Sequence, residues 1–389
     1  MSQDVTVIIP TFNRPEMLPR TLSFLQNTAN RLPIIVADGS DAENSARNLQ
    51  TCRRVGANVS YVHLPAPPEI ADASPFCRYE EIVAHYFRRY LLALTRVATR
   101  YVVHCGDDDL LMPEAIIESA KFLDGNSEYV ACHGMYFNFR YANSGIDVEC
   151  CTYDGPAIDG NEFGSRVIQL FSRYESSYAA VYRTSLQKVI LERLVEMPWA
   201  LFSEIFHATA TLVHGKVKRL DRIYYLRNVG VPSNPRPFED WNQWILKDWD
   251  GFLAYYLEYR TRITAFAAAR MSPALDPDRL RRTIDLAFML YVGRDFSMAY
   301  WIYQYLATAV VAQEERDRLG ILVNERLLAP PPSQPPPAPQ PLHEVRGDAG
   351  SAPLRVPAAV AARHPPPQWE LLRSKLQSRV RKTGRSREP

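Results

Sequence analysis

Apolar and polar positions alternate along the first 125 residues in blocks that predict strands and helices in turn. Short runs rich in Val and Ile predict strands, and the longer stretches between them carry apolar residues at helical spacing. The predicted strands cover 5–9, 33–37, 59–64 and 101–105, and the predicted helices begin near Pro15, Asp41, Cys77 and Pro113. This order is typical of a parallel sheet whose strands are joined by crossover helices. The pattern therefore predicts an α/β fold.

The pattern of the second half is more mixed. It predicts strands over 128–141, 178–183 and 216–227 and a helix over 161–173, with two further helical runs between the last two strands. From 239 to 328 the pattern is helical and rich in Trp and Tyr. An aromatic stripe of this kind packs helices together more often than it binds a ligand, so we expect it to form a core.

The composition changes at Pro330, where the segment PPPSQPPPAPQP begins. Such a segment buries too little apolar surface to fold and is expected to be disordered or polyproline-like. Near its end, residues 369–382 (WELLRSKLQSRVRK) place apolar residues on one helical face against basic residues. We favour a weakly structured, solubilising tail, with weak contact to a partner or to the inner face of a membrane as the alternative.

The overall composition is that of a globular protein. Of 389 residues, 47% are hydrophobic, and the formal net charge of +2 gives no strong attraction to nucleic acid. The six cysteines show no CxxC or Cys/His spacing, which argues against a zinc site and a disulfide framework. No secretory leader pattern precedes the first predicted strand, and the apolar stretch 299–312 is too short to span a membrane. We therefore expect a cytoplasmic protein that binds no nucleic acid.

Three consecutive aspartates, Asp107 to Asp109, follow the fourth predicted strand. Two carboxylates about 5 Å apart repel by roughly 3 kcal/mol at an effective dielectric of about 20. The cluster therefore needs water, a basic side chain or a cation beside it, and a divalent ion would suffice. Helix capping is the alternative, because Pro113 suits a first helical position and Glu114 would complement a helix amino end. Capping explains one acid, so a metal or nucleotide role and a solvated turn both stay open.

Two other polar stretches fall at equivalent places. PTFNRP (10–15) follows the first predicted strand, DGSD (38–41) the second, and GDDD (106–109) the fourth. In open parallel sheets ligands bind beyond the carboxyl ends of the strands, so all three stretches are expected on one edge. Pro, Asn, Gly, Ser and Asp are also ordinary turn residues. A turn explains any one stretch, but it does not explain why the three converge.

Together these stretches resemble the inverting, family-2-like glycosyltransferases of the GT-A fold, which use nucleotide-sugar donors. The resemblance rests on VTVIIPTFNRP, IIVADGSD and YVVHCGDDDLLMPEAI and covers about residues 4–230. The triple aspartate followed by PEAI is most similar to a bacterial subgroup of sugar transferases. The resemblance implies a Rossmann-like, mostly parallel central sheet with flanking helices, and a role in surface polysaccharide or glycoconjugate synthesis.

The resemblance also implies which residues bind the donor. The loop after the first strand would lie along the nucleotide, Asp38 would read the uracil or ribose, and Asp107 would contact the ribose. The residues matching donor-binding positions are Pro10, Thr11, Asn13, Arg14, Asp38 and Asp107.

A metal ion is implied as well. Asp108 would bind Mg²⁺ or Mn²⁺, with Asp109 adjoining it, and the ion would stabilise the charge of the departing nucleoside diphosphate. Gly106 departs from the commonest form of the motif, Asp-x-Asp-Asp. The departure leaves open which aspartate holds the metal, and we favour Asp108.

Inversion needs a base that takes the proton of the acceptor hydroxyl, and the family places it on an acid near the start of a helix. Glu204 in MPWALFSEIFHATATLVHGK (197–216) matches best. The alternative is a helix amino-end glutamate that follows a Ser203 cap. His207 is expected to pack or orient. Arg227, at the end of a predicted strand, could meet the diphosphate or the acceptor.

These matches predict a domain organisation. We expect a glycosyltransferase domain over 1–235, with a nucleotide-binding half (1–125) and an acceptor half (126–235), then a helical extension (236–328) and the tail (329–389). The expected partners are a nucleotide-sugar donor, with UDP favoured, and a sugar or glycoconjugate acceptor.

Other functions are disfavoured or stay open as alternatives. Neither glycine-rich motif of a dehydrogenase or an NTPase occurs. A sugar nucleotidyltransferase would want a glycine-rich first loop, and PTFNRPEMLPR has no glycine. A non-catalytic carbohydrate-binding protein would keep the fold without turnover.

Overall fold

The computed structural model describes residues 4–27, 32–67, 70, 79–142, 145–197, 200–231, 241–271 and 276–295. Its strands are β1 Val5–Thr11, β2 Ile34–Asp38, β3 Val59–His63, β4 Tyr101–His104, β5 Leu110–Leu111, β6 Tyr129–Ala142, β7 Gly145–Tyr153, β8 Val181–Arg183 and β9 Lys216–Asn228. Its helices are α1 Leu18–Gln26, α2 Ala42–Val55, α4 Tyr79–Leu94, α5 Pro113–Gly125, α6 Phe163–Ser172, α7 Thr184–Leu194, α8 Ala200–His214, α9 Trp241–Lys247, α10 Trp249–Ala268 and α11 Pro277–Asp295.

The described strands form one sheet in the order β3-β2-β1-β4-β8-β6-β9-β5, with β7 paired to β6. Strands β3, β2, β1 and β4 are mutually parallel. Beyond β4 the sheet is mixed, because β8 is antiparallel to β4 and β6 while β9 runs parallel to β6. The predicted α/β fold with a central sheet and flanking helices is confirmed, and its parallel part coincides with the first four predicted strands.

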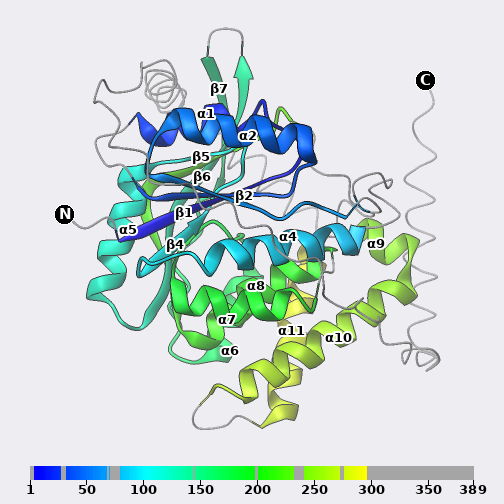
Figure 1. Cartoon of the computed structure of the whole chain (residues 1–389). Helices are drawn as coiled ribbons and strands as arrows, with labels where there is room; N and C mark the ends of the chain where they lie inside the picture. The colour runs from blue at the N-terminus through cyan, green and yellow to red at the C-terminus, as the bar shows by residue number, and fades with distance from the viewer. Residues whose placement is uncertain are drawn as a thin grey trace, which may run out of the picture.

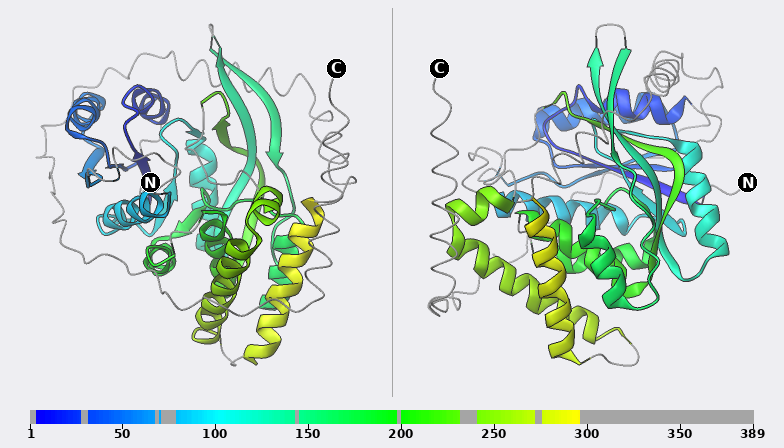
Figure 2. Two further views of the ribbon diagram at one scale, coloured as in Figure 1. Left: turned by 90° about the vertical axis from the view of Figure 1, so that its right-hand side faces the viewer. Right: turned by 180° about the vertical axis from the view of Figure 1, so that it is seen from behind.

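Both faces of β1 and β2 are buried, as a continuous Val/Ile pattern requires. Successive side chains of β1 alternate between two cores: Val7 and Ile9 enter one, and Ile8 enters the other. Helices α1, α2 and α5 cover the first core, and α4, α7 and α8 cover the second (Figures 1 and 2). The helices thus cover the two faces of the sheet, and the polar loops can meet at the carboxyl ends of the strands.

The described aromatic residues of α9, α10 and α11 form a core, as predicted. Trp241 and Trp244 are each 3% exposed, and both rings contact Phe202 of α8. Phe288 of α11 packs on Tyr256 of α10 with ring centroids 4.6 Å apart. Helices α9 to α11 therefore rest on α8 and α6 rather than forming a separate body (Figure 2).

The pattern did not predict β5 and β7. Strand β5 has two residues, too few to show a period. Strand β7 (GIDVECCTY) is partly exposed along most of its length, and among the described strands it pairs only with β6, so its mixed sequence carries little alternation.

Several expectations fall on the later part of the chain. The tail and the apolar stretch 299–312 lie outside the described residues. In the part that the structure does describe, no helix combines the length and the apolar character that crossing a membrane would take. The five described cysteines are free thiols.

Candidate functional site

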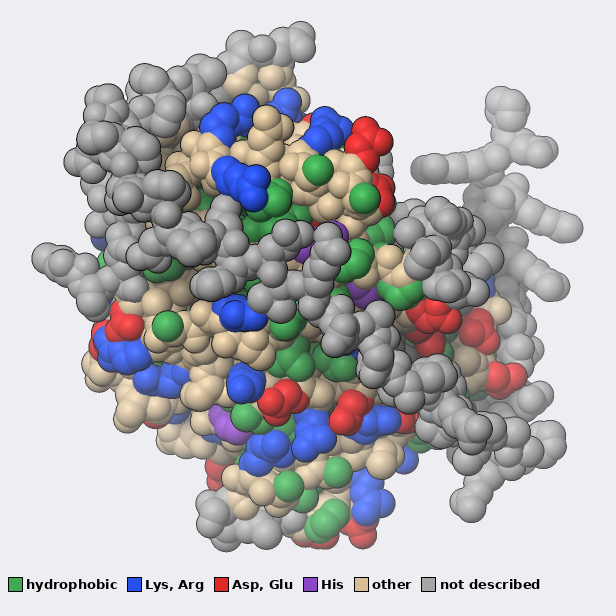
Figure 3. Space-filling model, in the orientation of Figure 1, with side chains coloured by type: hydrophobic (Ala, Val, Ile, Leu, Met, Phe, Trp, Pro, Cys, Tyr) green, Lys and Arg blue, Asp and Glu red, His purple; other side chains and the backbone are tan. Residues whose placement is uncertain are grey.

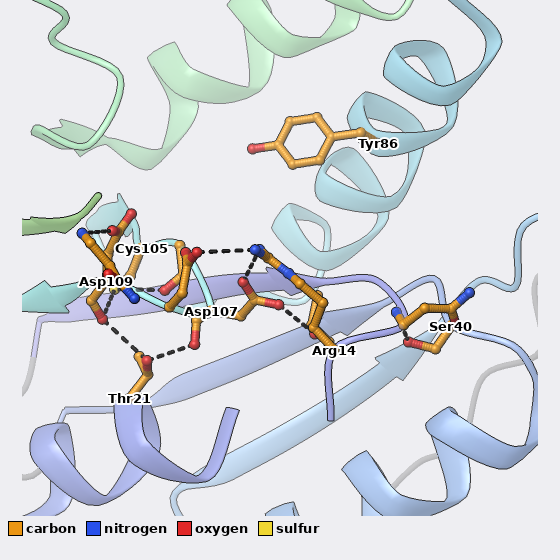
Figure 4. Close-up of polar contacts among 12 residues, drawn as sticks. Arg14, Thr21, Ser40, Tyr86, Cys105, Asp107 and Asp109 are labelled. Carbon is orange, nitrogen blue, oxygen red and sulfur yellow. Dashed lines mark hydrogen bonds and ion pairs between the residues drawn. The ribbon is translucent and has the colours of Figure 1, made fainter. Parts of the chain in front are cut away.

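Three loops meet at the carboxyl edge of the parallel strands (Figure 4). The guanidinium of Arg14, after β1, pairs with the carboxylates of Asp107 and Asp108, after β4, and its Nη1 lies 3.0 Å from Oδ2 of Asp108. The Asn13 backbone N–H donates to Oγ of Ser40, after β2, at 2.8 Å. The polar stretches after the first, second and fourth strands therefore come together as the sequence predicts.

Asn13 fixes the loop that carries Arg14. Its φ of 52° lies in the left-handed region, which Asn tolerates better than most residues other than Gly. Its Oδ1 accepts a hydrogen bond from the Asp41 backbone N–H at 3.0 Å. Pro10 and Thr11, which end β1, are buried beside β2. The first loop is thus bent by Asn13 and tied to the second.

Asp107 forms the buried floor of the site. Its Oδ2 accepts from Thr11 Oγ1 at 2.8 Å, and its Oδ1 accepts from Arg14. Burial raises the pKa of Asp107 to about 6, and the Arg14 guanidinium opposes that rise. Asp108 is more accessible, with 15% of its side chain exposed. Of these two acids, Asp108 is the one that a ligand can reach directly.

Asp109 points the other way, toward β9. Its carboxylate accepts from the Tyr225 hydroxyl and, at 2.8 Å, from the Asn228 backbone N–H. Burial, aided by the charge of Asp108, raises its pKa to about 7. The carboxylate also folds over Gly106, where an added Cβ would stand 2.4 Å from Asp109 Oδ2. The glycine at the first motif position is therefore required by the inward Asp109.

The three aspartates do not converge on one point. Among the described residues, no group of three or more His, Cys, Asp or Glu side chains is arranged to hold a metal ion. A Mg²⁺ ion at a diphosphate commonly uses one or two carboxylates, and phosphate oxygens and water complete its shell. Asp108 fits such a site. Asp109 fits it less well in this arrangement, because its carboxylate turns toward β9, where its two oxygens accept from Tyr225 and Asn228.

Asp38 lies at the end of β2 and is fully buried. Its Oδ1 accepts from the Ser40 backbone N–H at 2.7 Å. Its Oδ2 accepts from Asn48 Nδ2 at 2.8 Å and from the Tyr61 hydroxyl at 2.6 Å. In this conformation Asp38 holds β2, β3 and α2 together, so contact with a base or ribose stays a prediction that requires an opening of this network.

The sequence reading missed Arg89 of α4. Its side chain is buried, and its Nε has no hydrogen-bond partner within the described structure. Its guanidinium is so close beneath the second loop that a Cβ at Gly39 would stand 1.7 Å from Nη1. Burial lowers the pKa of Arg89, and the charges of Asp38 and Asp107 oppose that shift. The signal available in the sequence was an arginine on a helix face that is apolar apart from His85.

Glu204 of α8 and Arg227 of β9 belong to the second half of the chain. Glu204, the fifth residue of α8, accepts from the Tyr174 hydroxyl at 3.2 Å and is half-buried. Arg227 is exposed on β9, and its charge opposes the rise that burial causes in the pKa of Asp109 and of Tyr153. Glu204 adds to the rise at Tyr153. Glu204 and Arg227 are thus both close enough to Tyr153 to influence its pKa.

His207 is packed rather than exposed, as expected. It is 1% exposed, and Nε2 lies 3.1 Å from Gln187 Oε1. The Tyr178 and Tyr182 rings lie against it, with centroids 4.9 and 5.2 Å away. Burial lowers its pKa to about 3.

The buried His207 predicts a pH effect on stability. An unfolded histidine takes up a proton below about pH 6.5, whereas folded His207 stays neutral down to about pH 3. The unfolded state then binds more protons, so the free energy of unfolding falls as the pH drops below 6.5. The glutamine of His207→Gln can still donate to Gln187 but does not titrate. Between pH 7.5 and pH 5 the free energy of unfolding of this variant should therefore fall by roughly 2 kcal/mol less than that of the unaltered chain. Urea unfolding at both pH values measures this, and parallel losses would contradict it.

Comparisons with known proteins give a fold-level likeness only. No family model and no curated protein matches the chain. Residues 1–349 of S. aureus TarS are 15% identical, with 84% of this chain and 81% of that chain covered and a TM-score of 0.45. That protein has also been solved with UDP and with UDP-GlcNAc. A second similar structure is the mannosyltransferase PcManGT from Pyrobaculum calidifontis in complex with GDP-Man and Mn²⁺. It is 12% identical, the similarity covers 84% of this chain and 85% of that chain, and the TM-score is 0.39. These similarities are too distant to assign a function.

Proposed function

We propose that the chain is a GT-A-type glycosyltransferase that moves a sugar from a nucleotide-sugar donor, with UDP favoured, to an acceptor hydroxyl with inversion. One observation carries the proposal: Arg14 joins Asp107 and Asp108 where three strand-end loops cross. This edge is where open α/β sheets bind nucleotides. It also carries both signs of charge, which a diphosphate linked to a ribose and a sugar requires.

The basic residues suit the diphosphate. Arginine is well matched to phosphate because its planar guanidinium donates two parallel hydrogen bonds. Arg14 is partly exposed and can turn from the aspartates to a phosphate, and Arg227 is exposed on β9 and close enough to influence Asp109. Arg89 supplies a fixed charge below the second loop. Asp107 and Asp38 are the acids placed to accept from ribose or base, Asp38 only after its network opens.

A Mg²⁺ or Mn²⁺ ion would be held by Asp108 together with the diphosphate, and it would stabilise the charge on the leaving group. Asp108 is the partly exposed acid of the three, and the ion would take the place of the Arg14 guanidinium that pairs with it in this structure. Asp109 instead positions Tyr225 and the end of β9 through its two hydrogen bonds.

Glu204 is the proposed base. Its carboxylate belongs to α8, away from the three loops, and the hydrogen bond from Tyr174 holds its orientation. A base separate from the donor acids is what in-line attack on the face opposite the leaving group demands. His207, three residues later, is too deeply buried to serve.

The first experiment separates this proposal from its rivals. The purified full-length chain is incubated with UDP-sugars and GDP-sugars and Mn²⁺, with and without candidate acceptors, and free nucleoside diphosphate is measured. Release that an acceptor accelerates supports the transferase. Release of pyrophosphate from a nucleoside triphosphate and a sugar phosphate would identify a nucleotidyltransferase instead. Donor binding without any turnover would identify a non-catalytic carbohydrate-binding protein.

A further inference from the structure

A hollow of about 250 Å³ lies between α7, α8 and α10, on different elements from the three loops of the candidate site. Its floor is apolar: Met197, Phe206 and Phe266 are each no more than 5% exposed. The wall of the hollow includes two alanines, Ala265 of α10 and Ala269 at the end of that helix. Their short side chains leave the space open. The hollow therefore lies between α8, the helix that carries Glu204, and α10.

The rim of this hollow is positively charged. Three arginines line it, Arg193, Arg262 and Arg270, against one carboxylate, Glu196. Arg262 is shared between Glu258, at 2.8 Å, and Glu196, at 3.6 Å. Arg193 reaches Glu196 at only 3.7 Å. In Figure 3 basic and acidic side chains gather on the lower part of the visible face, over α7 and α10.

Arg270 carries the least compensated charge. Its guanidinium stacks on the Phe266 ring, with Cζ 3.8 Å from the centroid, and its Nη1 lies 3.4 Å from the Phe266 carbonyl oxygen. In the described part of the chain it makes no ion pair with a carboxylate. Burial lowers the pKa of Arg270, and the nearby charge of Arg193 lowers it further. Two cations thus face one space and repel one another.

We propose that this hollow binds a small anion with an apolar body, such as a phosphate monoester, its anionic group between Arg193 and Arg270 and its apolar part on Phe206 and Phe266. An anion would relieve the repulsion between the two arginines, and charge-assisted hydrogen bonds to guanidinium are among the stronger ones. The arginine-lined rim and the apolar floor suit a phosphate with a short alkyl chain or a lipid headgroup.

Calorimetry with n-butyl phosphate on the full-length chain tests the site. Butyl phosphate should bind at least about fivefold more tightly than inorganic phosphate, because the apolar floor buries part of the alkyl chain. Arg270→Gln should weaken its binding about tenfold. Ala265→Leu, which keeps every charge and a good helix former but fills the hollow, should weaken it similarly.

Two control variants locate the binding. Arg281→Gln removes an arginine of α11 that pairs with Asp278 and does not line the hollow, so it should leave the affinity unchanged. Asp108→Asn should also leave it unchanged, which keeps this result separate from the outcome for the proposed transferase. Absence of saturable binding, or equal affinity in Ala265→Leu and the unaltered chain, would overturn the proposal.

Vesicles distinguish the source of the anion. Phosphatidylcholine vesicles with and without phosphatidic acid are sedimented with the chain. Binding that requires phosphatidic acid, is displaced by butyl phosphate and is lost in Arg270→Gln supports a lipid headgroup. Calorimetric binding of butyl phosphate without vesicle binding supports a soluble anion. Vesicle binding that persists in Arg270→Gln and Ala265→Leu, with no calorimetric signal, would place lipid contact elsewhere and reject the site.

Discussion

Glu204→Gln should lower kcat by roughly 10² to 10⁴ while donor affinity stays within about twofold. Glutamine keeps the length and the acceptor oxygen that Tyr174 contacts at 3.2 Å, but it cannot take a proton from the acceptor hydroxyl. The donor loops carry none of this side chain's contacts, so nucleotide binding should be spared. Steady-state kinetics with the donor found in the panel, together with UDP calorimetry, measure both quantities.

Two further variants sharpen the result. Glu192→Gln removes a carboxylate from the exposed face of α7 and should leave kcat unchanged. Tyr174→Phe removes only the hydrogen bond to Glu204, so kcat should fall by a smaller factor than in Glu204→Gln. Normal turnover in Glu204→Gln, or loss of UDP binding by this variant, would show that another group is the base.

Asp108→Asn should weaken Mn²⁺-dependent binding of UDP at least tenfold and leave the fold intact. The side chain is partly exposed at a strand end and pairs with Arg14, so its loss removes little packing. Calorimetry with Mn²⁺ and with EDTA measures the metal dependence. Equal UDP affinity in both conditions for the unaltered chain would reject a metal role at this site.

Asp109→Asn is the matched comparison. Its carboxylate faces Tyr225 and Asn228 instead of the mouth of the site, so the variant should keep its metal dependence even if its stability changes. The reverse result, with metal dependence lost in Asp109→Asn and kept in Asp108→Asn, would reassign the ligand. The pair therefore decides between the two acids that the sequence left open.

The parallel half of the fold could be predicted because its signals are local. Apolar runs such as VTVII indicate strands that are buried on both faces. Asp41 caps α2 by accepting from the Asn44 backbone N–H at 2.9 Å. The convergence of the three polar stretches then follows from the topology of a parallel sheet. Strand β7 escaped prediction because an edge strand with partly exposed faces needs no clear period.

The direction of each side chain could not be predicted, because it depends on distant partners. Asp109 turns inward to Tyr225, 116 positions later in the chain. Asp38 is enclosed by Tyr61 and Asn48, which lie on two other elements. Arg89 became a candidate only when α4 was placed beneath Gly39. Residue type and spacing identify the edge of the sheet, and the long-range contacts decide which groups face a ligand.

If Asp108 holds the metal as proposed, the pairing of Arg14 with Asp107 and Asp108 makes Arg14 a competitor for that ion. A tethered guanidinium acts at a high effective concentration, so a free divalent ion has to displace it from Asp108 and should bind weakly by itself. A nucleoside diphosphate would change this competition, because its phosphate oxygens would accept hydrogen bonds from the released guanidinium. Metal and nucleotide then assist each other's binding, with the same coupling free energy in both directions. Arg14 would in this way keep the acids neutralised between turnovers and make the site admit the ion together with its substrate.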